Sequence, residues 1–245
     1  MVYDPRDAKR NNTYNFFVST EQTGNGAEQS IAHGFSKVPD IVLVVPSSFI
    51  ITNASTFVQG VHTSTNVLAT VTSGAKYYVI AAIKQISPRR SRYDGGVRIW
   101  VSSEQTGPQA TIAHPLKYIP NKTFIVPSAN AAGASTFTIA SVTESNINTT
   151  GTTAATKYYV VAIANNIRLP RATKEEMFRL STEVTGNASS QSIAHIHKTI
   201  PTITVPIPSY CSTAAATTYA AGTHTALNSL FTVTAAARYR VLTIF

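Results

Sequence analysis

Short runs of alternating apolar and polar residues recur along the whole chain, separated by clusters of Gly, Pro, Asn and Ser. Alternation with a period of two is typical of half-buried β-strands, and runs this short favour strands over helices. Proline brackets several of the runs, which suits a residue that cannot donate to a strand ladder. In the first third of the chain the pattern predicts six strands, at Asn15–Thr20, Glu28–Ala32, Ile41–Val45 (between Pro39 and Pro46), Thr56–His62, Val67–Val71 and Lys76–Ile83.

The pattern occurs three times, because the chain contains three copies of one unit. His33, His114 and His195 each end an Ile-Ala-His triplet and lie 81 residues apart. A Ser-Thr-Glu-Gln-Thr-Gly segment at 19–24 returns with small changes at 102–107 and 181–186. Several short strands with regular turn signals indicate a sandwich or small barrel. We therefore predict an all-β protein of three tandem small antiparallel β-sandwiches, arranged around a pseudo-threefold axis or as beads on a string.

The landmarks also define the boundaries of the units. A capping box, Thr173 to Glu176, predicts a short helical turn ahead of the third copy. A unit of about 65 residues buries only about 60% of its unfolded surface, so each copy gains stability by packing against the others. The predicted parts are an N-terminal arm at 1–14, sandwiches at 15–84, 99–164 and 179–245, and linkers at 85–98 and 165–178.

Basic residues concentrate between the copies. The chain carries 20 Lys and Arg against 11 Asp and Glu, a net charge of +9. Such a charge favours negatively charged partners. Aromatic residues for stacking on bases are sparse in the basic stretches, so we do not expect nucleic acid. We expect partner binding by nine residues of the arm and linkers: Arg6, Lys9, Arg10, Arg89, Arg90, Arg92, Arg168, Arg171 and Lys174.

The repeated histidine is the sharpest chemical feature of the sequence. If the copies surround an axis, His33, His114 and His195 could converge on a metal such as zinc or nickel. The alternative is a histidine at a strand end whose ring bonds a neighbouring turn, and we favour it, expecting no metal and no cofactor. His62 and His224 also correspond, with Thr143 at the matching place of the second copy.

A repeated glutamate, Glu21, Glu104 and Glu183, accompanies the histidine. A Glu and a His invite acid–base chemistry, which needs a pocket and a partner of shifted pKa. Hydrogen bonds in the adjoining Thr-Gly turn explain the carboxylate as well. The sequence has no Gly-x-Ser-x-Gly, phosphate-binding glycine loop or His-Glu-x-x-His, so we expect no enzyme.

Compartment signals are few. Cys211 is the single cysteine, which excludes an internal disulfide framework. The first residues lack the apolar core of a secretion signal, and the longest apolar runs are too short to span a bilayer. We expect a soluble protein made in a cytoplasm, without membrane insertion.

The segment Ile-Ala-His-Gly-Phe-Ser-Lys-Val-Pro-Asp-Ile-Val-Leu-Val at 31–44, with the late strand at 77–83, resembles a repeat of tailed-phage virion proteins. There a His-Gly turn precedes a proline and a valine-rich strand. Such units occur in fibres and head accessory proteins, and are similar to the small β-sandwich of H-type lectins, which assemble as trimers. The second and third copies depart from it, with Pro115 and Ile196 after the histidine, so no family binding residue is carried over.

The resemblance implies a viral structural protein located in the virion, as a capsid decoration or a fibre component. Its partners would be other virion proteins, in a homo-oligomer or lattice. The alternative is a lectin-like adhesin that recognises host surface glycans through outward loops.

Overall fold

The structure, a computed structural model, describes residues 14–50, 54–84, 97–108, 111–130, 134–150, 153–165, 178–195, 200–211 and 217–245. These residues form 22 strands and no helix, which confirms the all-β prediction. The helical turn predicted at Thr173–Glu176 lies outside the described residues.

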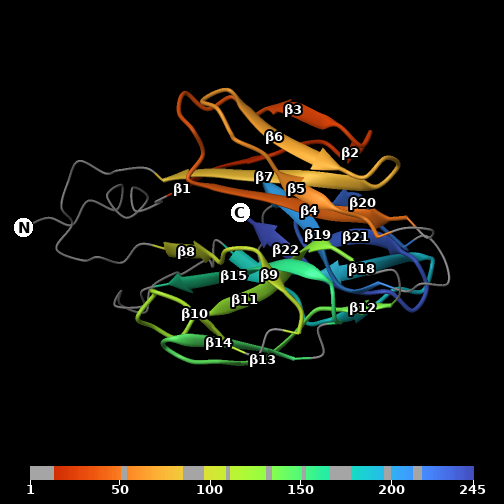
Figure 1. Ribbon diagram of the computed structural model, residues 1–245. Helices are drawn as coiled ribbons and strands as arrows, with labels where there is room; N and C mark the ends of the chain where they lie inside the picture. The colour runs from red at the N-terminus through yellow and green to blue at the C-terminus, as the bar shows by residue number, and fades with distance from the viewer. Residues whose placement is uncertain are drawn as a thin grey trace, which may run out of the picture.

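Each copy contributes a larger and a smaller antiparallel sheet with the same strand order (Figure 1). In the first copy these are β1 (Tyr14–Val18), β2 (Gln22–Thr23), β7 (Lys76–Lys84) and β4 (Ile41–Phe49), with β3 (Glu28–Ala32), β6 (Asn66–Val71) and β5 (Phe57–Gln59). In the second they are β8 (Val97–Val101), β9 (Gln105–Thr106), β15 (Lys157–Asn165) and β11 (Lys122–Ala129), with β10 (Thr111–Ala113), β14 (Asn146–Thr150) and β13 (Thr138–Val142). In the third they are β16 (Phe178–Leu180), β17 (Val184–Thr185), β22 (Arg238–Ile244) and β19 (Ile203–Cys211), with β18 (Ser190–Ala194), β21 (Asn228–Val233) and β20 (Thr217–His224).

The larger sheets are buried on both faces, which explains their unbroken apolar runs. In β4, Val42 and Val44 belong to the core cluster of the sandwich interiors, whereas Leu43 and Val45 belong to a second cluster. All three copies contribute to that second cluster, so it is a core that the copies share. Its other fully or nearly fully buried members include Ile80, Phe124, Val126, Val161, Ile163, Phe178, Val205, Ile207 and Leu242.

Strand pairing between copies closes a ring. The first copy pairs with the second, the second pairs with the third through β12 (Ser135–Thr136), and the third pairs with the first. Because the same kind of contact recurs and returns to its start, the copies surround a pseudo-threefold axis in a closed head-to-tail arrangement. The paired residues at these three seams are Thr56 with Ala129, Ser135 with Cys211, Thr136 with Tyr210, Thr217 with Phe49, and Thr218 with Ser48.

Proline lies inside the long strands instead of ending them. We predicted that the third strand stops before Pro46, but β4 continues to Phe49 and the ladder shifts register between Pro46 and Ser48. The same shift follows Pro127 in β11 and Pro208 in β19. A bulge accommodates the missing amide hydrogen, and the residues after it pair with the next copy at the seam.

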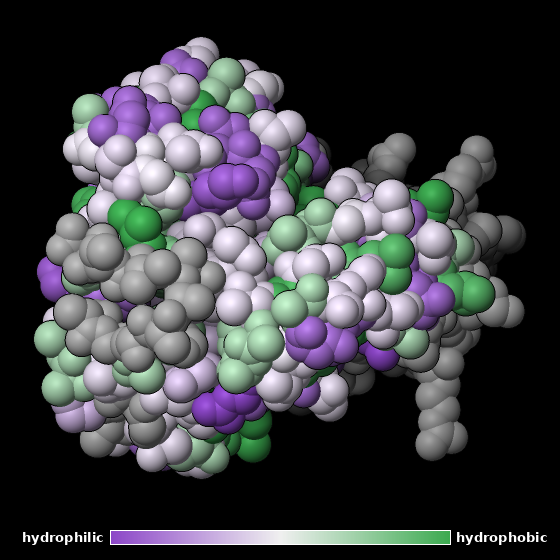
Figure 2. Space-filling model, turned by 90° about the vertical axis from the view of Figure 1, so that its right-hand side faces the viewer, coloured by the Kyte–Doolittle hydropathy of each residue, from purple (hydrophilic) through white to green (hydrophobic). Residues whose placement is uncertain are grey.

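The molecule has two different ends. In Figure 1 the strands β7, β15 and β22 all finish on one side, and their register places the starts of β1, β8 and β16 there too. We call this side the linker end and define it by Tyr14, Lys84, Val97, Asn165, Phe178 and Phe245. The seams lie at the opposite, seam end, where Figure 2 shows three lobes with mostly hydrophilic and neutral residues on their surface.

Candidate partner-binding surface

The nine basic residues predicted to bind a partner all lie outside the described residues: Arg6, Lys9, Arg10, Arg89, Arg90, Arg92, Arg168, Arg171 and Lys174. The described residues that flank them are nonetheless informative. The arm meets the described chain at Tyr14, the first linker at Lys84 and Val97, and the second at Asn165 and Phe178. All three basic segments are therefore attached at the linker end.

Three exposed apolar side chains also belong to the linker end. Val38, Ile119 and Ile200 are 52%, 59% and 66% exposed, and each precedes a buried proline. Strands β4, β11 and β19 each begin two residues after this proline. A single exposed apolar side chain is ordinary, but the same exposure at three equivalent positions is a pattern. We did not predict this exposure from the sequence, although an apolar residue before a proline recurs every 81 residues.

Polar contacts hold the loops of this end in place. The Lys37 ammonium donates to the Lys84 carbonyl at 2.8 Å and lies 3.3 Å from the Asp40 carboxylate. Burial raises the pKa of the Tyr14 hydroxyl, although a hydrogen bond with the backbone of Ile99 lowers it. That bond joins the first copy to the second. The exposed apolar side chains therefore belong to an end of the molecule whose loops and copies are held by polar contacts.

The repeated histidines occupy three separate places, one in each copy. In every copy Nε2 faces a loop carbonyl, and in the first two copies Nδ1 accepts a hydrogen bond from a backbone amide two residues later. A carbonyl oxygen can only accept, so the network assigns the proton to Nε2. The described residues contain no group of three His, Cys, Asp or Glu placed to hold a metal. The Nε2 contacts are His33 with Thr63 at 3.2 Å, His114 with Thr143 at 3.0 Å and His195 with Thr225 at 3.1 Å.

The turn whose carbonyl lies against these histidines shows that the second copy was aligned incorrectly with the other two. Thr63, Thr143 and Thr225 each accept a hydrogen bond from the amide of an asparagine three residues later, at 2.9, 2.9 and 3.0 Å. Thr143 is thus equivalent to Thr63, and Val142 stands where the first and third copies have His62 and His224. The uniform spacing of 81 residues, which matched His62 with Thr143, was therefore wrong by one residue at this position.

The serine and the glutamate of the repeated Ser-x-Glu-x-Thr-Gly segment make structural contacts in all three copies, and its glycine is constrained in two of them. Its glutamates form exposed ion pairs with a basic residue of the facing strand: Glu21 with Lys76, Glu104 with Lys157 and Glu183 with Arg238, at 3.1, 3.4 and 3.2 Å. Its serine hydroxyls accept buried amide hydrogens of the same strand. At Gly24 and Gly186 a Cβ atom would collide with the carbonyls of Thr72 and Thr234. The recurrence of the segment therefore needs no catalytic explanation.

Two cavities lined by described residues are too small for a sugar or a peptide. One, of about 10 Å³, lies inside the third copy beside His195, and the other, of about 20 Å³, lies between the second and third copies beside Glu183. Each has room for about one or two water molecules.

Among the described residues no helix is long and apolar enough to cross a membrane. Comparisons with protein-family models, with curated proteins and with solved structures find no match.

Proposed function

We propose that this chain is a non-enzymatic structural protein of a virus particle, a capsid decoration or a fibre component, which docks on the particle through its linker end. One observation carries the proposal. Val38, Ile119 and Ile200 expose apolar side chains at the same position of each copy, on the end to which all three basic segments are attached. A single-chain body with this repeated surface is suited to a protein lattice that offers several equivalent contacts.

Apolar burial and charge would act together at such an interface. Fully burying a Val or Ile side chain contributes about 1.5–3 kcal/mol, and three contacts on one body add avidity. The nine basic residues of the arm and linkers outnumber the five acidic residues of the same segments, Asp4, Asp7, Asp94, Glu175 and Glu176, so these segments carry a net positive charge toward a negatively charged neighbour. A single exposed ion pair contributes only about 0.2–1 kcal/mol, so the charges must act as a group.

The test is co-sedimentation of the purified chain with particles that lack it, from the virus whose genome encodes the chain. We expect the wild type to pellet with the particles. The triple variant Val38→Asp, Ile119→Asp, Ile200→Asp should lose binding by at least about 100-fold, because three buried apolar contacts are replaced by charges. A second variant, Arg89→Glu, Arg90→Glu, Arg92→Glu, should bind more weakly, and its binding should fall further as salt is raised.

Val58→Asp is the matched control, because Val58 is 47% exposed on β5, away from the linker end. It should bind as the wild type does. Wild-type-like binding by both multiple variants would refute docking through the linker end. Binding to host glycans that is lost on changing outward loops would instead support the adhesin.

A further inference from the structure

The loop before each long strand is held in the same way in all three copies. Its proline is buried, and the next residue donates its amide hydrogen to a carbonyl near the end of the paired strand. These bonds, each 2.9 Å long, run from Asp40 to Ala82, from Asn121 to Ile163 and from Thr202 to Ile244. The side chains before the prolines, Val38, Ile119 and Ile200, are therefore held at equivalent places, and we call them the apolar triad.

The apolar triad surrounds the pseudo-threefold axis. Strands β4, β11 and β19 contact one another, and their equivalent residues Leu43, Phe124 and Val205 belong to the shared core. All three strands begin at the linker end, three residues after a member of the triad. Three residues of extended chain span at most about 11 Å, so each member lies within that distance of the start of an axial strand. The exposed side chains thus form a triangle around the axis instead of three remote patches.

The triad is the one large apolar position that is exposed in every copy, as far as the chain is described. The other exposed apolar residues Val58, Val61 and Leu227 have Thr138, Ser141 and Ser145 at the matching places of the second copy. The neighbours of the triad change as well: Lys37, Tyr118 and Thr199 precede it, and Asp40, Asn121 and Thr202 follow the proline. Duplication of the unit alone does not explain why only the triad stays aliphatic. A contact that is repeated three times on one partner explains it.

Charge favours a partner other than a second copy of this chain. Among the described residues, the loops and strand ends of the linker end carry the basic residues Lys37, Lys84, Arg98, Lys117 and Lys122 and the acidic residues Asp40 and Glu144. The arm and linkers attached there are net positive too. Two chains that met by their linker ends would bring like charges together, whereas an acidic partner would complement them.

We propose that the partner at the linker end is a protein assembly with threefold symmetry, in which three identical subunits each contact one member of the triad beside acidic groups. This inference rests on the proposed docking through the linker end. Equivalent groups of the chain meet equivalent groups of the partner at all three positions only if the two share a threefold axis. One chain therefore binds three subunits of one kind.

The first test is photocrosslinking of the full chain to particles that lack it. A benzophenone side chain replaces Val38, Ile119 or Ile200, one at a time, and mass spectrometry identifies the crosslinked particle peptide. We expect all three positions to crosslink to the same segment of one particle protein. The matched control carries the group in place of Val58 on β5 and should give no crosslink. At saturation, we expect no more than one bound chain for every three subunits of the crosslinked protein.

The second test measures the affinity of three single variants, Val38→Asp, Ile119→Asp and Ile200→Asp, for the same particles. Each should weaken binding roughly tenfold, a change of about 1.4 kcal/mol, because each removes one of three equivalent apolar contacts. The three factors should agree within about threefold.

The outcomes separate the threefold partner from the docking itself. Crosslinks from the three positions to different proteins or to another copy of this chain, or a loss of affinity in only one variant, would overturn the threefold partner and leave docking intact. More than one bound chain for three subunits would do the same. A wild-type chain that does not pellet with the particles would overturn both.

Discussion

Ser19, Ser102 and Ser181 each accept a hydrogen bond from a buried backbone amide of the facing strand, at 2.9, 2.9 and 2.8 Å. Each serine also donates its own amide hydrogen to the carbonyl of the same facing residue. The serine thus bridges the gap in the ladder between β1, β8 or β16 and the two-residue strand that follows it. Without the hydroxyl, a buried amide would have no acceptor.

We predict that Ser102→Ala lowers the free energy of unfolding by about 1–3 kcal/mol, the cost of an unpaired buried amide. Ser102 is 6% exposed and bonds the amide of Val160. Urea unfolding measures the change. Ser103→Ala, at the exposed neighbour, should change the free energy by less than about 0.5 kcal/mol. Equal effects of the two variants would contradict this assignment.

We predict that the protein loses stability in mild acid because of two histidines, His62 and His224. Burial lowers the pKa of each below 6.5, and the nearby His33 or His195 lowers it further. The unfolded chain then binds more protons than the native one, so the contribution to stability is present above pH 6.5 and is lost as the pH falls through the native pKa. The double variant His62→Val, His224→Val, which copies Val142, should show a smaller fall in Tm from pH 7 to pH 5. A fall equal to that of the wild type would mean that other groups cause it.

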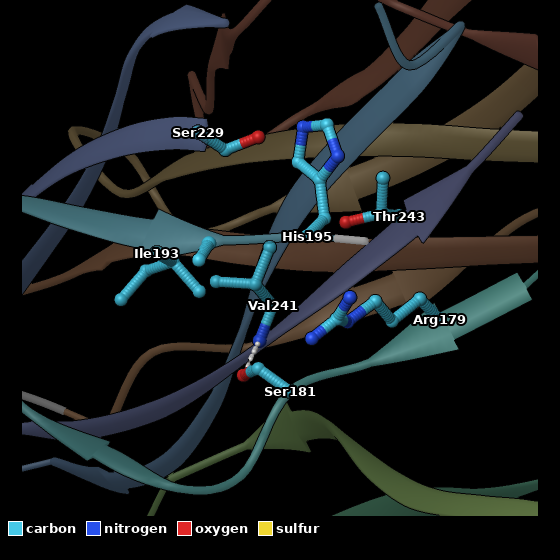
Figure 3. A pocket seen from close by; sticks show the side chains of 8 residues that line it. Arg179, Ser181, Ile193, His195, Ser229, Val241 and Thr243 are labelled. Carbon is cyan, nitrogen blue, oxygen red and sulfur yellow. Dashed lines mark hydrogen bonds between the residues drawn. The ribbon is translucent and has the colours of Figure 1, made fainter. Parts of the chain in front are cut away.

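At the scale of elements, alternation predicted most strands of the first copy to within two or three residues. It missed two-residue strands such as β2 (Gln22–Thr23), which are too short to show a period. It misplaced the end of β4 because proline ends most strands, whereas here a bulge and pairing to another copy carry the strand through. The cavity beside His195 (Figure 3) could not be predicted, since it lies between two sheets of the third copy and the alternation along each strand does not show how the sheets pack.

The seam between the second and third copies contains a natural probe. Cys211 of β19 pairs with Ser135 of β12 and is 1% exposed. Burial raises the pKa of its thiol, which reduces the reactive thiolate. We predict that a thiol reagent modifies native Cys211 on the order of 100-fold more slowly than the denatured chain. Comparable rates in the two states would mean that this seam is open in solution.

At the scale of the whole molecule, the shared core makes the three copies dependent on one another. Leu43, Val45, Phe124 and Val126 are nearly fully buried in a cluster that includes residues of all three copies. Repetition in the sequence predicted three units, but it left open a ring or beads on a string. Whether the units form a ring or separate beads is decided by two features. One is the apolar face of each long strand that points away from its own sandwich and into the shared core, and the other is the pairing at the seams.

We predict that the full chain unfolds in a single cooperative transition, because no copy keeps its shared-core face covered alone. A chain ending at residue 164 lacks the third copy and leaves that face of β4 and β11 exposed. It should show no cooperative transition in urea, measured by circular dichroism. A truncated chain with a cooperative transition of wild-type midpoint would show that the copies fold as independent beads.

Docking through the linker end is the central claim, and electron cryomicroscopy of the intact virus particle tests it most directly. The account predicts a three-lobed density on the particle surface with Val38, Ile119 and Ile200 against a neighbouring virion protein and the seam end facing solvent. Density with the seam end against the particle, or a particle without this chain, would contradict the account.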